Sequence, residues 1–188
     1  LYINYIMQED LAQNAINLAY PFNARVITFN DGPINKPHAL NKGLSEAKNE
    51  ITVVFDAEDE VNADIFNVVN TLYLTKKPDI IQAGVQLMNY DSHWCSSHNV
   101  LEYYFWFKSR MHFYTSIGMV PLGGNTVFFK KDQLNKEGGW DEDCLTEDAE
   151  VGIRLSVQGA RILSTYDSDH ITKEETPATV GQFIKQRT

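Results

Sequence analysis

The sequence predicts a single α/β domain with a mostly parallel sheet and helices on both of its faces. Short β-rich runs alternate with helical segments over the first half of the chain, which is the rhythm of a parallel sheet. The run at 51–55 is nearly all apolar, as in a strand that is buried on both faces. The chain has 188 residues, 43% of them hydrophobic, which suits one core and is too short for two ordinary domains.

The expected elements follow from hydrophobic periodicity and from helix start and stop signals. In the first half, strands are expected at 1–7, 25–29, 51–55 and 79–87, with helices at 11–19, 36–47 and 62–75 between them. After Met88 the rhythm changes, and helices are expected at 99–116, 147–157 and 177–187. A glycine loop at 121–126 leads into a short strand at 127–129.

The composition excludes several classes of protein. With 16 Lys plus Arg and 25 Asp plus Glu, the net charge of −9 argues against non-specific binding to nucleic acid. There is no run of about 18 apolar residues and no signal peptide, so we expect this stretch to be soluble. Two cysteines are too few for a disulfide framework or a zinc site, which favours a reduced, cytoplasmic setting.

An acidic motif follows the apolar strand, with Asp56, Glu58 and Asp59 within four residues. In open α/β sheets, ligands bind beyond the carboxyl ends of the strands. Closely spaced carboxylates at this position suit Mg²⁺ or Mn²⁺, which often share their coordination with phosphate groups of a substrate. An acidic, solvated turn that caps the next helix is an equally open interpretation.

A second acidic motif, Thr146-Glu147-Asp148, stands at the expected start of a helix. Thr146 suits the N-cap, and the helix dipole favours carboxylates in the first turn, so helix chemistry alone explains these residues. The same dipole would keep Asp148 ionised, as a general base must be. Lys36, at another helix start, could contact phosphate or could simply be a surface residue.

Taken in order, these motifs resemble those of the family 2 glycosyltransferases, of the membrane-associated type that includes cellulose synthase-like enzymes. The resemblance covers nearly the whole chain. It rests on the ordered segments Lys36…Ala39-Leu40-Asn41, Asp56-Ala57-Glu58, Pro121-Leu122-Gly123-Gly124, Gly138-Gly139-Trp140, Thr146-Glu147-Asp148 and Gln186-Arg187. It implies a GT-A fold, which is a Rossmann-like sandwich, with residues 1–90 as the nucleotide-sugar-binding half and 91–188 as the acceptor-side half.

The resemblance also assigns roles to individual residues. It makes Asp148 the general base of an inverting sugar transfer. It places the nucleotide-diphosphate sugar, a UDP-sugar as first choice, against Glu9, Asp10, Lys36, Asn41 and Asp56. It implies that Mg²⁺ or Mn²⁺ is held by Asp56, Glu58 and Asp59. On the acceptor side, for a saccharide or a lipid-linked acceptor, it points to Gly123, Gly124, Trp140, Glu147, Gln186 and Arg187.

Several alternatives stay open at this level. Trp140 could stack on an acceptor sugar or belong to the core. The aromatic segment at 99–116 could be core, an acceptor-facing or membrane-facing surface, or an oligomer contact. A nucleotidyltransferase, or a non-catalytic module that binds sugar nucleotides, would also fit acidic residues on a Rossmann-like sheet.

The resemblance further suggests that the chain is a fragment. The first strand of the family is absent, and the Gln-x-x-Arg-Trp motif of processive members is incomplete at Gln186-Arg187-Thr188. We therefore expect the full-length protein to act at the cytoplasmic face of a membrane, attached through segments outside this chain.

Overall fold

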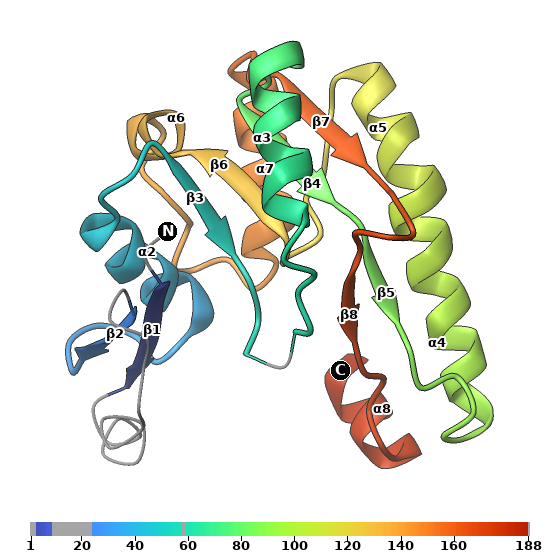
Figure 1. Ribbon diagram of the computed structural model, residues 1–188. Coiled ribbons are helices and arrows are strands. Elements are labelled where there is room, and N and C mark those ends of the chain that lie inside the picture. The colour runs from blue at the N-terminus through green and yellow to red at the C-terminus, as the bar shows by residue number, and fades with distance from the viewer. Residues whose placement is uncertain (1–2, 9–23, 58, 188) are drawn as a thin grey trace.

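A computed structural model describes residues 3–8, 24–57 and 59–187, whose strands form three sheets (Figure 1). β1 (Ile3–Gln8) pairs in parallel with β2 (Ala24–Phe29). The central sheet has the order β3-β6-β4-β7, made of β3 (Ile51–Val54), β6 (Val127–Lys130), β4 (Ile80–Ala83) and β7 (Ile162–Thr165). β5 (Val85–Leu87) and β8 (Thr172–Glu174) form a third, parallel pair.

The strand directions agree with the predicted, mostly parallel sheet, except at β6. Among the described strands, three of the five pairs are parallel, and β6 is antiparallel to both β3 and β4. β6 is the short strand that was expected after the glycine loop. The strands β7 and β8 were not anticipated, because β7 has only four residues and is polar at one end, and β8 has three residues that are all polar.

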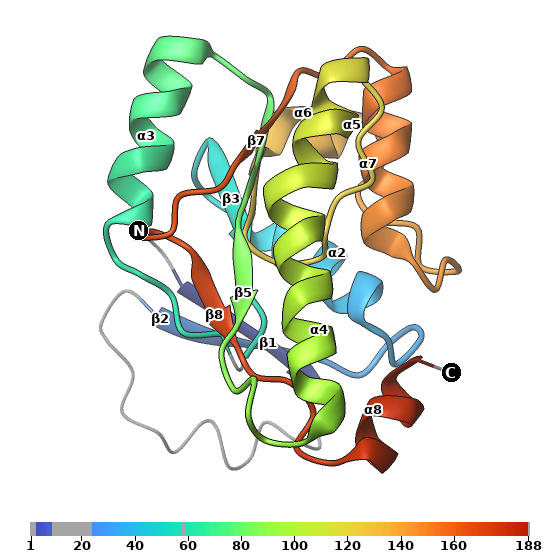
Figure 2. The same cartoon turned by 90° about the vertical axis from the view of Figure 1, so that its right-hand side faces the viewer.

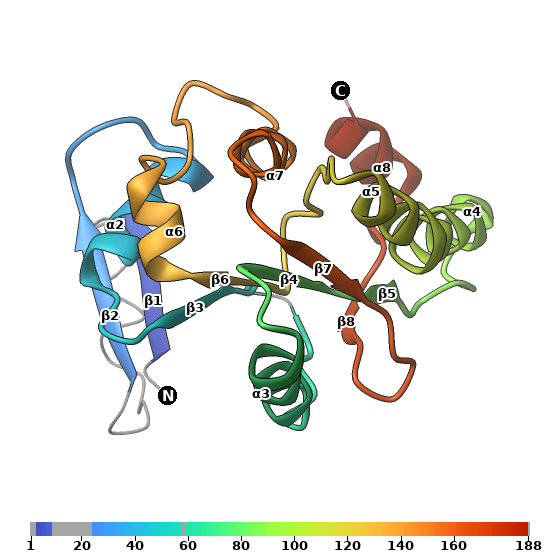
Figure 3. The same ribbon diagram turned by 90° about the horizontal axis from the view of Figure 1, so that it is seen from above.

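Helices cover both faces of the central sheet (Figure 3). α3 (Ile65–Lys76) lies on one face, and α6 (Lys131–Lys136) and α7 (Glu147–Val157) lie on the other. Neighbouring residues of β6 serve opposite faces, because side chains alternate along a strand. Phe128 packs in the core cluster beneath α3, whereas Phe129 belongs to the cluster beneath α7.

The expected strand at 79–87 is interrupted at Gly84, so β4 and β5 belong to different sheets. A Cβ atom on Gly84 would lie 2.7 Å from Cδ2 of Tyr166, so only glycine allows this close approach. The Gly84 carbonyl accepts a hydrogen bond from the Thr172 amide at 3.0 Å, at the point where β8 begins. The chain thereby leaves the central sheet and pairs with β8.

The aromatic segment is one continuous helical rod that begins earlier than expected (Figure 2). It consists of α4 (Trp94–Phe105), a π-helical turn at Trp106–Arg110 and α5 (Met111–Ile117). Its inner face supplies Phe107 and Met111 to the core, which supports the core interpretation. Its outer face exposes five large apolar side chains, Trp94, Leu101, Phe105, Phe113 and Ile117. A surface role therefore stays open for the outer face alone.

The remaining helices are α2 (Lys36–Glu46) and α8 (Val180–Arg187), both close to their expected bounds. The helix expected at 11–19 lies outside the described residues. Within the described part of the chain, no helix combines the length and the apolar character that crossing a membrane requires.

Candidate active site

The site begins where α2 meets the carboxyl end of β3. Asn35 caps α2 by accepting a hydrogen bond from the His38 amide at 3.0 Å, and this fixes the first turn of the helix. Lys36 is the first residue of α2, and its Nζ lies 2.9 Å from Oδ1 of Asp56 and 3.4 Å from the carbonyl oxygen of Gly124. The ammonium group of Lys36 thus contacts both Asp56 and the glycine loop.

The first turn of α7 supplies Asp148 to the same place. Gly124 has a φ of +90°, and a Cβ atom there would lie 2.8 Å from Oδ2 of Asp148, so the glycine loop lies directly against this carboxylate. Burial raises the pKa of Asp148 to about 7. Lys36 opposes that rise, whereas the charge and hydrogen bond of buried Glu147 and the charge of Asp56 add to it.

Lys36 is the positive counterpart of this acidic group. Burial works to lower the pKa of Lys36, but the hydrogen bond and charge of Asp56, followed by the charges of Asp148 and Glu147, raise it overall. The ammonium therefore stays protonated between carboxylates that come from two different elements. One cation and three acids gathered beyond the carboxyl end of β3 make this the candidate active site.

The start of α7 differs from its predicted chemistry in two respects. The helix dipole was expected to keep Asp148 ionised, but burial outweighs it and raises the pKa to about 7. Thr146 occupies the N-cap position, but its side chain makes no capping hydrogen bond. The expected pair between Glu150 and Arg154 is present, with Nε of Arg154 2.6 Å from Oε1 of Glu150. Arg154 also donates to the carbonyl oxygens of Glu137 and, at 2.7 Å, of Gly139, so it ties α7 to the Gly-Gly turn.

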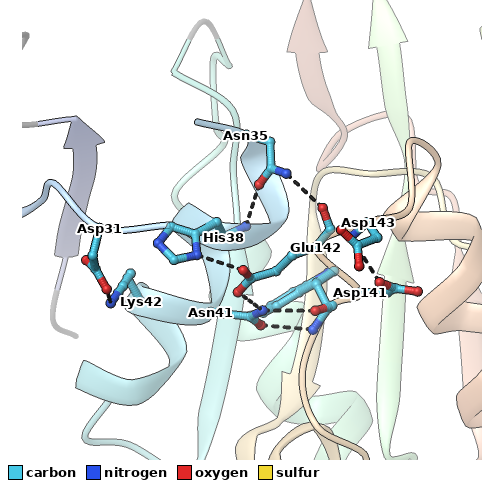
Figure 4. A network of polar contacts seen from close by, with 9 residues as sticks. Asp31, Asn35, His38, Asn41, Lys42, Asp141, Glu142 and Asp143 are labelled. Atoms are coloured by element: carbon cyan, nitrogen blue, oxygen red, sulfur yellow. Dashed lines mark hydrogen bonds and ion pairs between the residues drawn. The ribbon is translucent and has the colours of Figure 1, made fainter. Parts of the chain in front are cut away.

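The structure gives Asn41 a different task from the expected one. Its Nδ2 donates to the Trp140 carbonyl and to Oε1 of Glu142, each at 2.9 Å, and its Oδ1 accepts from the Trp140 amide at 2.9 Å (Figure 4). Both amide hydrogens are used within the protein. Asn41 therefore holds the Gly-Gly-Trp loop against α2, and its expected contact with the nucleotide stays a prediction.

Trp140 belongs to the core. Its side chain is 5% exposed, and its ring meets Phe129 edge to face at 5.5 Å between the centroids. A sugar that stacks needs an open face of the ring, so the acceptor role expected for Trp140 is corrected in favour of the core alternative.

Asp59 is also used internally. Its Oδ2 accepts from the Asp56 amide at 2.8 Å, and its Oδ1 accepts from Nδ2 of Asn125 at 3.1 Å. These bonds fix the Asp59 carboxylate within the turn, and its expected role as a metal ligand stays a prediction. Glu58 lies outside the described residues.

Asp56 is the expected metal ligand whose surroundings are best described. Across the described ranges, no three His, Cys, Asp or Glu residues are grouped so that they could hold a metal ion. The Asp56 side chain is 32% exposed, so its carboxylate can be reached from solvent, but it already pairs with Lys36. By its position and chemistry, Asp56 fits as one carboxylate ligand of an ion whose other ligands come from a substrate.

Gln82 was missed by the sequence reasoning and organises the glycine loop. It is fully buried in β4, its Oε1 accepts from the Gly123 amide at 2.8 Å, and its Nε2 donates to the Ala83 and Asn125 carbonyls, each at 3.0 Å. Gly123 itself packs on Phe107, because a Cβ atom there would lie 2.8 Å from the ring. A single amide in the otherwise apolar run Ile80–Ala83 was the available signal.

Four other expected residues give no structural result. Glu9 and Asp10 lie outside the described residues, and Gln186 and Arg187 lie in α8 at positions whose side chains are not described. Their assignment to the nucleotide and to the acceptor stays a prediction.

The sequence matches a known family. The pattern of the family described as Glycosyltransferase like family 2 matches residues 9–188, so the chain belongs to this glycosyltransferase family. That membership favours sugar transfer over nucleotidyl transfer.

Curated relatives synthesise glycolipids and polysaccharides. The chain is 30% identical over 64% of its length to a β-monoglucosyldiacylglycerol synthase of Trichormus variabilis, of which it covers 26%. It is 27% identical over 81% of its length to a poly-β-1,6-N-acetyl-D-glucosamine synthase of Staphylococcus aureus, of which it covers 37%. A probable glucomannan 4-β-mannosyltransferase of Oryza sativa is 24% identical over 95% of the chain, which covers 32% of it. The chain thus spans about a quarter to two fifths of these relatives.

Solved structures confirm the GT-A fold. The mannosyltransferase PcManGT of Pyrobaculum calidifontis, in complex with GDP-Man and Mn²⁺, has a TM-score of 0.62 at 21% identity over 87% of this chain and 43% of its own. TarS of Staphylococcus aureus, in complex with UDP-GlcNAc, has a TM-score of 0.58 at 14% identity over 89% of this chain and 46% of its own.

Proposed function

We propose that the protein containing this chain transfers a sugar, with inversion, from a nucleotide-diphosphate sugar to a saccharide or lipid-linked acceptor in polysaccharide or cell-envelope glycan synthesis. The names of the relatives, which include a diacylglycerol glycoside synthase and a polysaccharide synthase, support these acceptor classes. The neighbouring structures hold GDP-Man or UDP-GlcNAc, so the donor is a nucleotide sugar in both. We keep a UDP-sugar as the first choice of donor.

One observation carries the proposal: a carboxylate with a pKa of about 7 lies at the carboxyl edge of the sheet, against a glycine loop. A general base works best when its pKa is near the working pH, because it is then both available and basic enough. Gly124 lets the loop approach the Asp148 carboxylate, because a Cβ atom there would lie 2.8 Å from Oδ2. An ordinary aspartate, with a pKa near 4, would be a much weaker base.

In the proposed reaction, Asp148 takes the proton of the acceptor hydroxyl as that oxygen bonds to the anomeric carbon. The bond from that carbon to the diphosphate oxygen breaks, and its electrons leave with the nucleoside diphosphate. Attack from the face opposite the leaving group inverts the configuration at that carbon. Lys36 keeps part of the Asp148 population ionised before the transfer, because its charge lowers the pKa of this acid.

A divalent cation, Mg²⁺ or Mn²⁺, belongs to the proposal, with Asp56 as its protein carboxylate. Such an ion stabilises negative charge on a leaving diphosphate. The Mn²⁺ ion in the PcManGT complex supports this part. Lys36, now paired with Asp56, lies at the N-terminus of α2, where a phosphate group is also favoured.

We further propose that the protein works at the cytoplasmic face of a membrane, attached through segments other than this chain. One relative is named as a synthase of a glucosylated diacylglycerol, and this lipid product supports a membrane location.

Calorimetry with UDP-sugars and GDP-sugars, with and without Mn²⁺, tests the proposal on the wild type, Asp56→Ala and Asp148→Asn. We expect binding to require the metal, to be lost in Asp56→Ala and to be retained in Asp148→Asn, whose turnover is abolished in the complete protein. Equal binding by all three proteins with and without Mn²⁺ would remove the role of Asp56. Undiminished turnover of Asp148→Asn would remove the assigned base.

A further inference from the structure

The loop at 137–142 lies between the two helices that carry the candidate site. On one side, Arg154 of α7 binds the Glu137 and Gly139 carbonyls. On the other, Asn41 of α2 binds both the amide and the carbonyl of Trp140. The loop is therefore hydrogen-bonded both to α2, which begins with Lys36, and to α7, whose first turn contains Asp148.

Glu142 makes a second set of bonds between this loop and α2 (Figure 4). Its Oε1 accepts from Nδ2 of Asn41 at 2.9 Å, and its Oε2 accepts from Nδ1 of His38 at 2.8 Å. Its own carbonyl accepts from Nδ2 of Asn35 at 2.8 Å. The hydrogen bonds from Asn41 and then His38 lower the pKa of Glu142, so its carboxylate stays ionised at neutral pH. One residue thus joins the loop to α2, with its main-chain carbonyl on the cap residue Asn35 and its side chain on His38 and Asn41.

The partners of Glu142 are themselves held in place. The His38 side chain is 8% exposed, and its ring meets Phe29 edge to face at 5.2 Å between the centroids. Gly32, with a φ of +76°, lies so close to the His38 ring that a Cβ atom there would come within 2.3 Å of it. Glu142 is therefore hydrogen-bonded to a buried, tightly packed His38 ring. Because charge-assisted hydrogen bonds are strong, this bond holds the loop in a fixed position relative to α2.

We propose that Glu142 is a positioning residue for the sugar transfer: through His38 and Asn41 it fixes the loop that holds Asp148 beside Lys36. This inference rests on the proposed function, because it assigns Asp148 as the base. Glu142 contacts neither Lys36 nor Asp148 through any described hydrogen bond, so it acts through the loop. The groups that set the charge around Asp148 are Lys36, Glu147 and Asp56.

The test compares Glu142→Ala and Glu142→Gln with the wild type in the protein that carries this chain. Glu46→Gln is the matched control, because the Glu46 carboxylate at the end of α2 also has a side-chain partner, Arg25 at 3.1 Å, but does not contact the loop. For each variant, kcat, the KM of the donor, and the pH dependence of kcat are measured.

We expect Glu142→Ala to lower kcat by roughly ten- to a hundredfold, because a small misplacement of a catalytic group costs about that much. The KM of the donor stays within about twofold, and the acidic limb of the kcat profile moves to higher pH, because Asp148 loses the nearby charge of Lys36. Glu142→Gln keeps one acceptor oxygen and recovers part of the loss and part of the shift, and Glu46→Gln matches the wild type. If the alanine variant does not fold, the shift of the acidic limb of the kcat profile in Glu142→Gln tests the proposal instead.

A loss of kcat with the acidic limb unchanged would overturn the proposal, since Glu142 would then support only the fold. Unchanged kcat in a folded Glu142→Ala protein would overturn it as well. Failure of the proposed function looks different: Asp148→Asn would retain turnover whatever the Glu142 variants do.

Discussion

Replacing Asp148 with asparagine should stabilise the protein at neutral and alkaline pH while it removes the proposed base. Burial raises the pKa of Asp148 from 3.8 to about 7, and the unfolded chain keeps the ordinary value. Between these two pH values, the folded state holds a proton that the unfolded state has released. The free energy of unfolding therefore falls as the pH rises from about 4 to about 7, and it stays reduced above that.

The size of the effect follows from the same shift. Each pKa unit corresponds to about 1.4 kcal/mol, so a shift of roughly three units gives a ceiling of about 4 kcal/mol. Asparagine must still bury its amide, and Lys36 loses a partner charge, so we expect about half of this ceiling, or about 2 kcal/mol, above pH 7. The difference shrinks as the pH falls toward 4 and disappears below the unfolded pKa of 3.8, where the aspartic acid is protonated in both states.

Urea unfolding at about pH 4.5 and about pH 8 measures this difference, with Asp79→Asn as the control of opposite sign. Burial raises the pKa of Asp79, but the Arg161 amide and the Lys130 ammonium outweigh it and lower the pKa overall. The contribution of Asp79 is therefore present above the unfolded pKa and lost in acid, so Asp79→Asn should be less stable than the wild type at pH 8. An Asp148→Asn protein no more stable than the wild type at pH 8, with the same pH slope, would refute the reasoning.

Two further substitutions test the site and its loop. Lys36→Met removes the charge that lowers the pKa of Asp148, so the acidic limb of the rate profile should move up by about one pH unit or more. An unchanged acidic limb would show that the charge of Lys36 does not act on Asp148. Gly139→Ala should lower the free energy of unfolding by roughly 2–4 kcal/mol, because alanine is strained at a φ of +77° and its Cβ would lie 2.3 Å from Oδ1 of Asn41. Gly138 has a similar φ but open space around it, so Gly138→Ala should cost only the backbone strain of about 1–2 kcal/mol. Thermal or denaturant unfolding measures both.

The order of the elements was largely predictable, because hydrophobic periodicity is a local signal. The helix expected at 147–157 has those bounds in the structure, and the strand expected at 25–29 begins one residue earlier, at Ala24. The break at Gly84 was not predictable, because it depends on the approach of Tyr166 from a distant segment. The antiparallel direction of β6 was likewise hidden, because the residues of a strand do not encode which neighbours it will pair with.

The site was predicted in outline and corrected in detail. Lys36, Asp56 and Asp148 were chosen from their motifs, and the structure places them together. Asn41 and Trp140 belong to the same motifs, yet they hold the loop and fill the core. A motif contains the residues that shape a site as well as those that act in it, and only three-dimensional contacts separate the two groups.

By itself, the sequence determined the class of fold, the family and the acids that could perform the chemistry, because all three are written in local pattern and motif order. Only the tertiary structure decided which acid is buried, which is already hydrogen-bonded and which remains reachable. These properties depend on neighbours far apart in the chain: Lys36 beside Asp56, Gly124 against Asp148, and Asn125 on Asp59. Burial and charge at such contacts set the pKa of Asp148, and that pKa separates a proposed base from an ordinary surface acid.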